Sequence, residues 1–181
     1  MKNKKSSFRK ISSRLIYRAH LFDLTAVRMK APTGREFKHE VIRHPGASVI
    51  VPLLSKDQFV LIRQFRSAVG RIIWEFPAGT LEKNESPLTC AKREIIEETG
   101  FSASRWKKIA MFYPAPGISS ELMHIYLARN LNRVGSKPEE DEYLHHEIVS
   151  FGQLSRMIKR GVVVDAKTMI GFYVYASLFK N

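Results

Sequence analysis

Residues 86–100 concentrate negative charge on what the sequence predicts to be one short helix. Within the run REIIEE, Glu94, Glu97 and Glu98 lie side by side or three to four positions apart. Like charges at these spacings repel one another on a helix and lower its stability. Side chains one turn apart point the same way, so a divalent cation at Glu94 and Glu98 would turn this repulsion into attraction. The alternative is a solvated charged face in which Arg93 pairs with Glu97.

The sequence also predicts where this helix begins and ends. Ser86 can cap its first turn, Pro87 fits a position that needs no backbone N–H, and Gly100 lies where helices commonly stop. Arg93 and the three glutamates are expected on the rest of the helix surface, outside its core-facing side. The core-facing side is predicted to contain Leu88, Ala91, Ile95 and Thr99.

Short apolar, β-branched runs on both sides of this helix predict strands. ASVIVPLL and FVLIRQF, separated by the polar SKDQ, have the pattern of a hairpin of buried strands. Two later segments, QLSRMIKRG and DAKTMIGFYVYASLF, predict helices near the C-terminus. Strands mixed with about three helices are typical of an α+β protein, in which a mixed β-sheet is sandwiched between helices (α/β/α).

Positive charge is concentrated at the N-terminus. The formal net charge is +13, from 30 basic and 17 acidic residues. Residues 1–20 hold seven of the basic residues and no acidic one, so the remainder has a net charge of +6. We predict a basic tail at residues 1–13 and one domain at residues 14–181, in which residues 14–45 form an N-terminal β region. The alternatives for the basic segment are a dimer or substrate surface, a nucleic-acid or membrane contact, and a mitochondrial transit peptide.

Composition excludes several classes of protein. One cysteine, Cys90, excludes a disulfide scaffold, and its place on the predicted helix is typical of a small buried apolar residue. No apolar run approaches the roughly 18–20 residues of a membrane-spanning helix, and no signal peptide opens the chain. We therefore expect a cytoplasmic protein without a membrane partner. Because more than half of the excess positive charge lies in one N-terminal segment, a nucleic-acid partner is not expected either.

Nine residues around the predicted helix follow one fixed spacing: Gly79, Glu85, Arg93, Glu94, Ile95, Glu97, Glu98, Gly100 and Phe101. This pattern, Gly-x5-Glu-x7-Arg-Glu-Ile-x-Glu-Glu-x-Gly-Phe, resembles the Nudix box at every specified position. The resemblance implies the Nudix fold and a metal site in a loop–helix–loop segment. It also implies hydrolysis of a nucleoside diphosphate linked to another group. The implied cofactor is Mg²⁺ or Mn²⁺, with two or more ions present when substrate is bound.

The same resemblance implies the metal ligands. Glu94 and Glu98 are similar to the main carboxylate ligands of the family, and Glu97 lies beside them. The backbone carbonyl of Ala78 is expected to be a further ligand. Glu97 is also a candidate catalytic residue.

Other residues of the box have implied supporting roles. Arg93 is expected to orient a glutamate through a charge-assisted hydrogen bond, with Glu85 as its partner, and we count Arg93 among the catalytic residues. Gly79 is expected to allow a tight backbone turn into the loop. Ile95 and Phe101 are expected in the core.

Sequences that flank the box resemble the ADP-ribose and nucleoside-diphosphate-sugar pyrophosphatase branch over roughly residues 14–178. Pro116, sixteen positions after the last glycine of the box, is a mark of that branch. Arg66 resembles a residue that holds the diphosphate, and Glu121 resembles a substrate-side carboxylate. Trp74, on the strand before the box, is a candidate platform for base stacking. The alternative for Arg66 is an exposed arginine at a strand end, and for Pro116 an ordinary loop proline. Glu121 could instead be a solvated carboxylate, and the role of Trp74 is otherwise open.

The branch places its general base, or an added metal ligand, in a loop beyond the box. Here the acidic loop KPEEDEYLHHEIVSF offers Glu139, Glu140, Asp141 and Glu142. Alignment of the loop on the following strand favours Glu142 as the catalytic base, with Glu140 as the alternative. The other interpretation is a solvated acidic loop without a catalytic role.

These resemblances favour Mg²⁺-dependent hydrolysis of nucleoside diphosphate sugars, with ADP-ribose split to AMP and ribose 5-phosphate. The alternatives are a GDP-mannose pyrophosphatase, a hydrolase of nucleoside triphosphates or RNA caps, and a nucleotide-binding module without activity. Members of the branch are usually homodimers. The strands predicted in residues 14–45 are therefore expected at a dimer interface.

Overall fold

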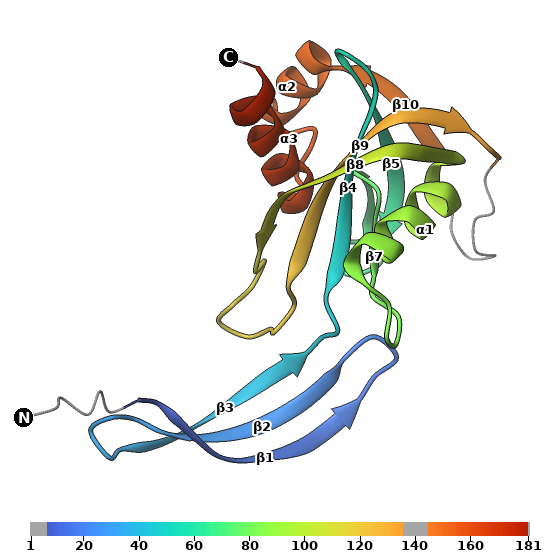
Figure 1. Ribbon diagram of the computed structural model, residues 1–181. Helices are drawn as coiled ribbons and strands as arrows, with labels where there is room; N and C mark the ends of the chain where they lie inside the picture. Colours follow the sequence, from blue (N-terminus) through green and yellow to red (C-terminus); the bar gives the residue numbers. More distant parts are fainter. Residues whose placement is uncertain (1–6, 136–144, 181) are drawn as a thin grey trace, which may run out of the picture.

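The computed structural model describes residues 7–135 and 145–180, which form two β-sheets and three helices (Figure 1). The small sheet contains β1 (Arg9–Arg18), β2 (Asp23–Lys30) and β3 (Glu36–Arg43). The larger sheet contains β4 (Ala47–Ser55), β5 (Gln58–Arg66), β6 (Arg71–Glu75), β7 (Ala78–Thr80), β8 (Phe101–Phe112), β9 (Met123–Arg133) and β10 (His145–Ser150). The helices are α1 (Pro87–Thr99), α2 (Phe151–Lys159) and α3 (Ala166–Phe179), none of them long and apolar enough to cross a membrane.

The larger sheet is mixed. Its strand order is β10-β5-β4-β9-β8, with β6 paired to β5 and β7 paired to β4. β4 and β9 run parallel, whereas the other paired strands run antiparallel. The hairpin predicted from the sequence is present as β4 and β5.

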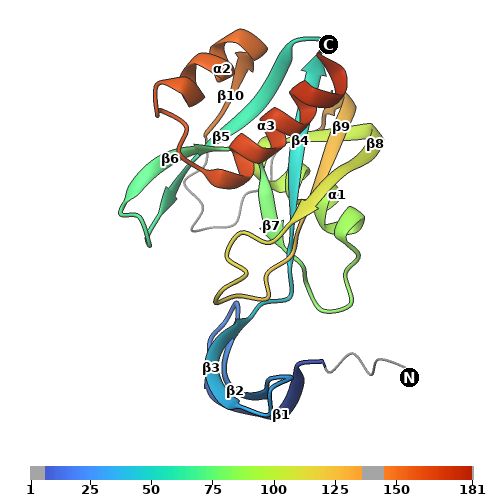
Figure 2. The same ribbon diagram turned by 90° about the vertical axis from the view of Figure 1, so that its left-hand side faces the viewer.

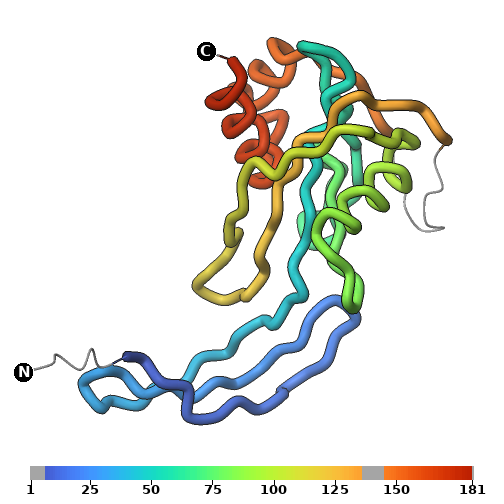
Figure 3. Tube along the Cα trace, viewed as in Figure 1, coloured from blue at the N-terminus to red at the C-terminus, as the bar shows by residue number. Residues whose placement is uncertain are grey.

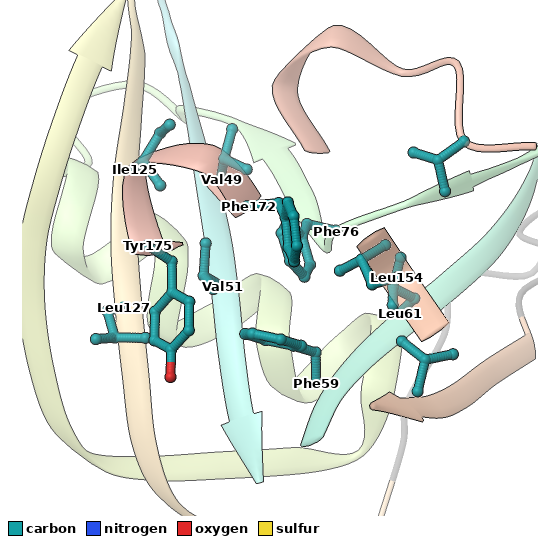
Figure 4. Close-up of a cluster of buried hydrophobic side chains, with 12 residues drawn as sticks. Val49, Val51, Phe59, Leu61, Phe76, Ile125, Leu127, Leu154, Phe172 and Tyr175 are labelled. Carbon is teal, nitrogen blue, oxygen red and sulfur yellow. The ribbon is translucent and has the colours of Figure 1, made fainter. Parts of the chain in front are cut away.

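Alternating side chains on β4 give this sheet a core on both faces. Val49 and Val51 pack on one side with Phe172 of α3 (Figure 4). Ile50 belongs to a second cluster, which contains Ile95 of α1. Accordingly, α1 covers one face of the sheet, while α2 and α3 cover the other (Figure 1, Figure 2). The predicted arrangement of a mixed sheet between helices is confirmed.

Local signals fix both ends of α1 where the sequence predicts them. The Ser86 hydroxyl accepts a hydrogen bond from the Thr89 backbone N–H at 3.2 Å, and Pro87 occupies the first turn. Gly100 ends the helix with a left-handed φ of 71°, and its N–H donates to the Ile96 carbonyl at 2.9 Å. Glycine adopts this backbone conformation without strain.

Two of the three α1 glutamates are buried, although they lie outside the predicted core-facing side of the helix. Glu94 and Glu98 are only 9% and 4% exposed, whereas Glu97 keeps partial contact with solvent. Strand β7 packs along this side of α1, so the helix is covered on more than its apolar face. The apolar periodicity of α1 does not predict that β7 packs against it, because the position of β7 depends on its pairing with β4.

The small sheet extends from one end of the larger one (Figure 3). Strand β1 begins at Arg9, so residues 9–13 of the predicted tail belong to a strand whose residues are all exposed. The Ile42 N–H of β3 donates to the Ile118 carbonyl at 2.8 Å, and the Ser120 N–H returns a bond to Ile42 at 2.9 Å. These bonds tie the small sheet to the loop between β8 and β9.

Replacement of Gly100 tests how strongly the end of α1 depends on glycine. A Cβ is strained in the left-handed conformation, so Gly100→Ala should lower the free energy of unfolding by about 1–2 kcal/mol. Gly100→Asn is the matched control, because asparagine tolerates this conformation better and should lose less. Urea denaturation followed by circular dichroism measures both variants. Wild-type stability in Gly100→Ala would contradict the assigned role.

Candidate active site

One pocket of about 600 Å³ lies between α1, β5, β7 and the turn that joins β1 to β2. Its charged wall includes Arg66, Arg93, Glu94, Glu97 and Glu98. The backbone of β7 and the loop that follows it form another side. The fold thus brings the carboxylates of the box into the same cavity as an arginine from a strand well before the box.

Arg93 holds the carboxylates of this pocket together. Its Nε and Nη2 donate to the two oxygens of Glu85 at 3.1 and 3.0 Å. Its Nη1 donates to Glu94 at 2.7 Å and to Glu97 at 2.9 Å. The expected contact between Arg93 and Glu85 is therefore present, and two further carboxylates share the same guanidinium. The hydrogen bonds from Arg93 hold the pKa of Glu85 below its ordinary value.

Strand β7 fixes the two buried glutamates of α1. Glu98 Oε2 accepts a hydrogen bond from the Ala78 backbone N–H at 2.9 Å. A Cβ on Gly79 would lie 1.7 Å from Glu94 Oε1, so only glycine leaves room for that carboxylate. Gly79 lies within a strand and has no positive φ, so the tight turn predicted for it is wrong. The close approach of β7 to Glu94 is what requires glycine.

Cys90 lies beside these groups, where its thiol donates to the Gly79 carbonyl at 3.4 Å and accepts from Arg93 Nη2 at 3.7 Å. Its side chain is fully buried on α1, as the sequence predicts. Burial, with the nearby charges of Glu94 and Glu85, raises the pKa of the Cys90 thiol to about 12. The thiolate is the nucleophilic form of cysteine, so this residue is inert at neutral pH.

The pocket offers the hard oxygen donors that Mg²⁺ and Mn²⁺ prefer. Glu94, Glu97, Glu98 and Ala78 all line it. Within residues 7–135 and 145–180, no three His, Cys, Asp or Glu side chains converge closely enough to enclose a cation by themselves. Mg²⁺ commonly binds one or two carboxylates, with waters and substrate phosphates completing its coordination. An open site of that kind fits the residues present.

Arg66 reaches the pocket from β5 and is fixed by Glu75 on the neighbouring strand β6. Its Nε and Nη2 donate to the two oxygens of Glu75 at 2.8 and 2.5 Å. The Glu75 side chain is 1% exposed and the Arg66 side chain 37% exposed. Burial acts to raise the pKa of Glu75, but the hydrogen bonds and charges of Arg66 and Lys167 outweigh it and hold that pKa below its ordinary value. Arg66 is therefore an accessible guanidinium at the end of β5, held in a fixed orientation by Glu75.

Other candidates do not line this pocket in the single chain. Trp74 packs against the larger core cluster. Glu121 lies at the junction with the small sheet, where a carboxylate oxygen is 3.9 Å from His44 Nδ1. Pro116 lies in the same loop between β8 and β9. The predicted base Glu142, with its acidic neighbours, lies outside the residues that the structure describes.

Several pocket residues were not predicted from the sequence. His20 and Leu21 come from the turn between β1 and β2. No local motif identifies them, because the fold of the small sheet brings this turn to the pocket. Gln64 could have been found, since it lies two positions before Arg66 and side chains alternate along a strand. Lys83 lies inside the box, at a position that the fixed residues leave open.

A mixed sheet between helices, with a glutamate-lined loop–helix–loop packed on one face, is the arrangement of the Nudix class of hydrolase. The chain belongs to the Nudix family, since the family model described as the NUDIX domain matches residues 42–170. With every fixed residue of the box present, the protein is a Nudix pyrophosphohydrolase.

Individual relatives are similar over most of their length. The chain is 35% identical over 160 residues to an ADP-ribose pyrophosphatase of Bacillus subtilis (strain 168), which covers 87% of this chain and 86% of the relative. It is 36% identical over 151 residues to a GDP-mannose pyrophosphatase of Enterobacter sp. (strain 638), which covers 72% and 77%. The crystal structure of an ADP compounds hydrolase matches with a TM-score of 0.83 at 21% identity, covering 96% of this chain and 95% of that one. This last similarity confirms the fold.

Gly79→Ala should remove activity while the protein stays folded. The added Cβ would occupy the place of Glu94 Oε1, so that carboxylate must leave its position in the pocket. We expect kcat/KM to fall by about 100-fold, the effect of displacing an active-site group by about 1 Å. Gly152→Ala on α2 is the control, because its Cβ would meet only Arg156, at 3.5 Å. Thermal midpoints show whether both variants fold, and a wild-type rate in Gly79→Ala would refute the role given to Glu94.

Proposed function

We propose that the protein hydrolyses the pyrophosphate bond of nucleoside diphosphate sugars with Mg²⁺, and that its preferred substrate is ADP-ribose, split to AMP and ribose 5-phosphate. The observation that carries the proposal is the pocket that joins the buried Glu94 and Glu98 to Arg66. Arginine suits the recognition of phosphate oxygens, and paired carboxylates suit a hard cation. The similarity to the Bacillus subtilis ADP-ribose pyrophosphatase supports the choice of substrate.

Arg66 is assigned to the diphosphate. A guanidinium has five N–H groups. The bonds to Glu75 use two of them, which leaves three for phosphate oxygens. Because Glu75 fixes the plane of the guanidinium, Arg66 can orient the pyrophosphate bond relative to the glutamates of α1.

The carboxylates of α1 are assigned to the cation. Glu94 and Glu98, with Glu97 and the Ala78 carbonyl, would hold Mg²⁺, which when bound neutralises phosphate charge and acidifies the attacking water. Arg93 keeps Glu94 and Glu97 in place through its hydrogen bonds. The Ala78 N–H does the same for Glu98.

The proton of the attacking water needs an acceptor. Glu142 is our proposed base, although it lies outside the described residues. The water oxygen forms a bond to phosphorus, and the bond from phosphorus to the bridging oxygen breaks. Both products leave as phosphate monoesters. Glu97 and Arg93 complete the proposed catalytic set by holding the carboxylate cluster together.

GDP-mannose is the second candidate substrate. The Enterobacter GDP-mannose pyrophosphatase is as similar in sequence as the ADP-ribose enzyme, although it covers less of the chain. Among its described residues, the pocket of the single chain is lined by no Phe, Tyr or Trp, so no large aromatic ring in its lining fixes the base preference. Hydrolysis of nucleoside triphosphates or RNA caps is less favoured by these relatives. A role in nucleotide binding alone is disfavoured by the complete box.

A homodimer would account for the candidate residues that lie away from the pocket. Strand β1 exposes Leu15 and Tyr17, and within the described part of the chain it pairs only with β2. A free strand edge with apolar side chains is commonly covered by another chain. We propose that a second copy packs there, so that Trp74, Pro116 and Glu121 help to bind substrate in the dimer. The basic segment before β1 is assigned no catalytic role, and the protein is proposed to act in the cytoplasm.

Product analysis with Mg²⁺ tests the proposed reaction. The panel contains ADP-ribose, GDP-mannose, UDP-glucose, ATP and capped RNA, with products resolved by chromatography. We expect AMP and ribose 5-phosphate to form with the highest kcat/KM. Faster release of GMP and mannose 1-phosphate would replace ADP-ribose by GDP-mannose. Activity on triphosphates or RNA alone, or none on the panel, would reject the proposal.

Glu98→Gln tests the assignment of the carboxylates. The amide keeps the shape of the side chain and can still accept from the Ala78 N–H, so the fold should survive. Loss of the charge should lower kcat by about 100-fold or more, as for other preorganised electrostatic groups. Glu36→Gln is the matched control, because Glu36 is an exposed residue of β3 that pairs with Arg28 at 2.8 Å. A near-normal rate in Glu98→Gln would remove that glutamate from the metal site.

A further inference from the structure

A second cation, Lys167, shares the carboxylate that fixes Arg66. Lys167 Nζ lies 2.5 Å from Glu75 Oε2, the oxygen that also accepts from Arg66 Nη2 at 2.5 Å. The side chains of Lys167 and Glu75 are 9% and 1% exposed. Lys167 does not line the active-site pocket. It can therefore influence substrate only through Glu75 and Arg66.

The first turn of α3 brings Lys167 to this place. Asp165 caps the helix by accepting from the Thr168 N–H at 2.9 Å, and its other oxygen lies 3.0 Å from Lys167 Nζ. The Thr168 hydroxyl accepts a hydrogen bond from the Phe76 N–H at 2.7 Å. Helix α3 thus holds two successive residues of the chain, Glu75 by its side chain and Phe76 by its backbone.

Charge balance gives the Lys167 ammonium a specific effect on Arg66. A buried carboxylate between two cations divides its attraction between them, so Glu75 does not neutralise Arg66 alone. The same ammonium lies between Glu75 and Asp165, which would otherwise face each other as like charges. Without Lys167, Glu75 would be compensated by Arg66 alone, so less of the Arg66 charge would be available to an anion. Glu75 would also lose the contact that holds its carboxylate from the side of α3, so the orientation that it gives to Arg66 would be less fixed.

We propose that Lys167 is a positioning residue for substrate, which through Glu75 holds Arg66 in the orientation that diphosphate binding requires. The inference rests on the proposed function, in which Arg66 contacts the diphosphate. Lys167 touches neither the substrate nor the reacting atoms. A purely structural role, in which Lys167 only anchors α3, would change stability but not affinity.

Lys167→Met tests the inference kinetically, because methionine keeps an unbranched apolar stem and removes the charge. The KM for ADP-ribose should rise about tenfold, while kcat stays within about twofold of the wild type. This pattern is expected when an interaction is lost that stabilises bound substrate and transition state equally. Lys167→Arg retains a cation and should bring KM back to within about threefold of the wild type. Lys180→Met is the matched control, because Lys180 directly follows α3 at its other end and pairs with Asp57 of the turn between β4 and β5. It should leave KM and kcat unchanged.

A second readout follows Arg66 without any turnover. The Arg66 Nε–H, bonded to Glu75 at 2.8 Å, should give a slowly exchanging ¹H–¹⁵N signal that Arg66→Lys removes. In Lys167→Met this signal should exchange about tenfold faster, because a Glu75 carboxylate no longer held from α3 allows the pair to open more often. In Lys180→Met and Lys167→Arg it should keep its protection. If Lys167→Met does not fold, Lys167→Gln supports the same two measurements.

The outcomes separate this inference from the proposed function. Faster exchange at Arg66 together with a higher KM supports it. A lower thermal midpoint with unchanged exchange and unchanged KM would overturn it, and so would faster exchange without a change in KM. If the wild type turns over no diphosphate sugar, the proposed function fails, while the Arg66 signal alone still decides whether Lys167 positions that side chain.

Discussion

The hydrogen bonds of Arg93 are the interaction on which the rest of the site depends. One guanidinium donates to Glu85, Glu94 and Glu97, so a positive charge lies among carboxylates that would otherwise repel one another. Like charges at helical spacing would destabilise an isolated helix. A planar guanidinium can serve several acceptors at once, which a lysine ammonium does less well. The glutamate cluster is therefore compatible with a folded α1 before any cation binds.

Burial of these glutamates also requires a backbone that approaches α1 closely and does not move. Residues 75–78, which lead into β7, are held at successive positions from different directions. The contacts are Glu75 with Arg66 and Lys167, the Phe76 N–H with Thr168, the Pro77 carbonyl with the Ile50 N–H, and the Ala78 N–H with Glu98. Functional groups on such a supported segment keep their geometry better than groups on a free loop. The precision of the site thus depends on α3 and β5 as well as on the box.

Signals between neighbouring residues allowed much of the fold to be predicted. Ser86 and Gly100 mark the ends of α1 through chemistry that acts within one helical turn, and the continuous apolar run ASVIVPLL predicts a buried strand. The features that were not predicted from the sequence depend on contacts between residues far apart in the chain. Burial of Glu94 follows from β7 lying against α1, and the bond between Lys167 and Glu75 spans 92 positions of the chain. In the sequence, Lys167 is one residue of a predicted helix, and nothing in its spacing indicates a buried carboxylate partner.

The charge of the pocket differs in sign from the charge of the whole chain. The chain carries +13, yet the ionisable Lys, Arg and Glu side chains that line the pocket comprise three cations and four glutamates. A basic protein attracts a diphosphate from a distance, but a net negative lining repels it at contact. A cation bound to the glutamates would supply the positive charge that overcomes this repulsion. Arg66, held by Glu75, would orient the diphosphate. The glutamates and Arg66 therefore have separate roles. Arg66 can orient the diphosphate only if a cation on the carboxylate cluster offsets the negative lining, and the cluster in turn is held together by Arg93.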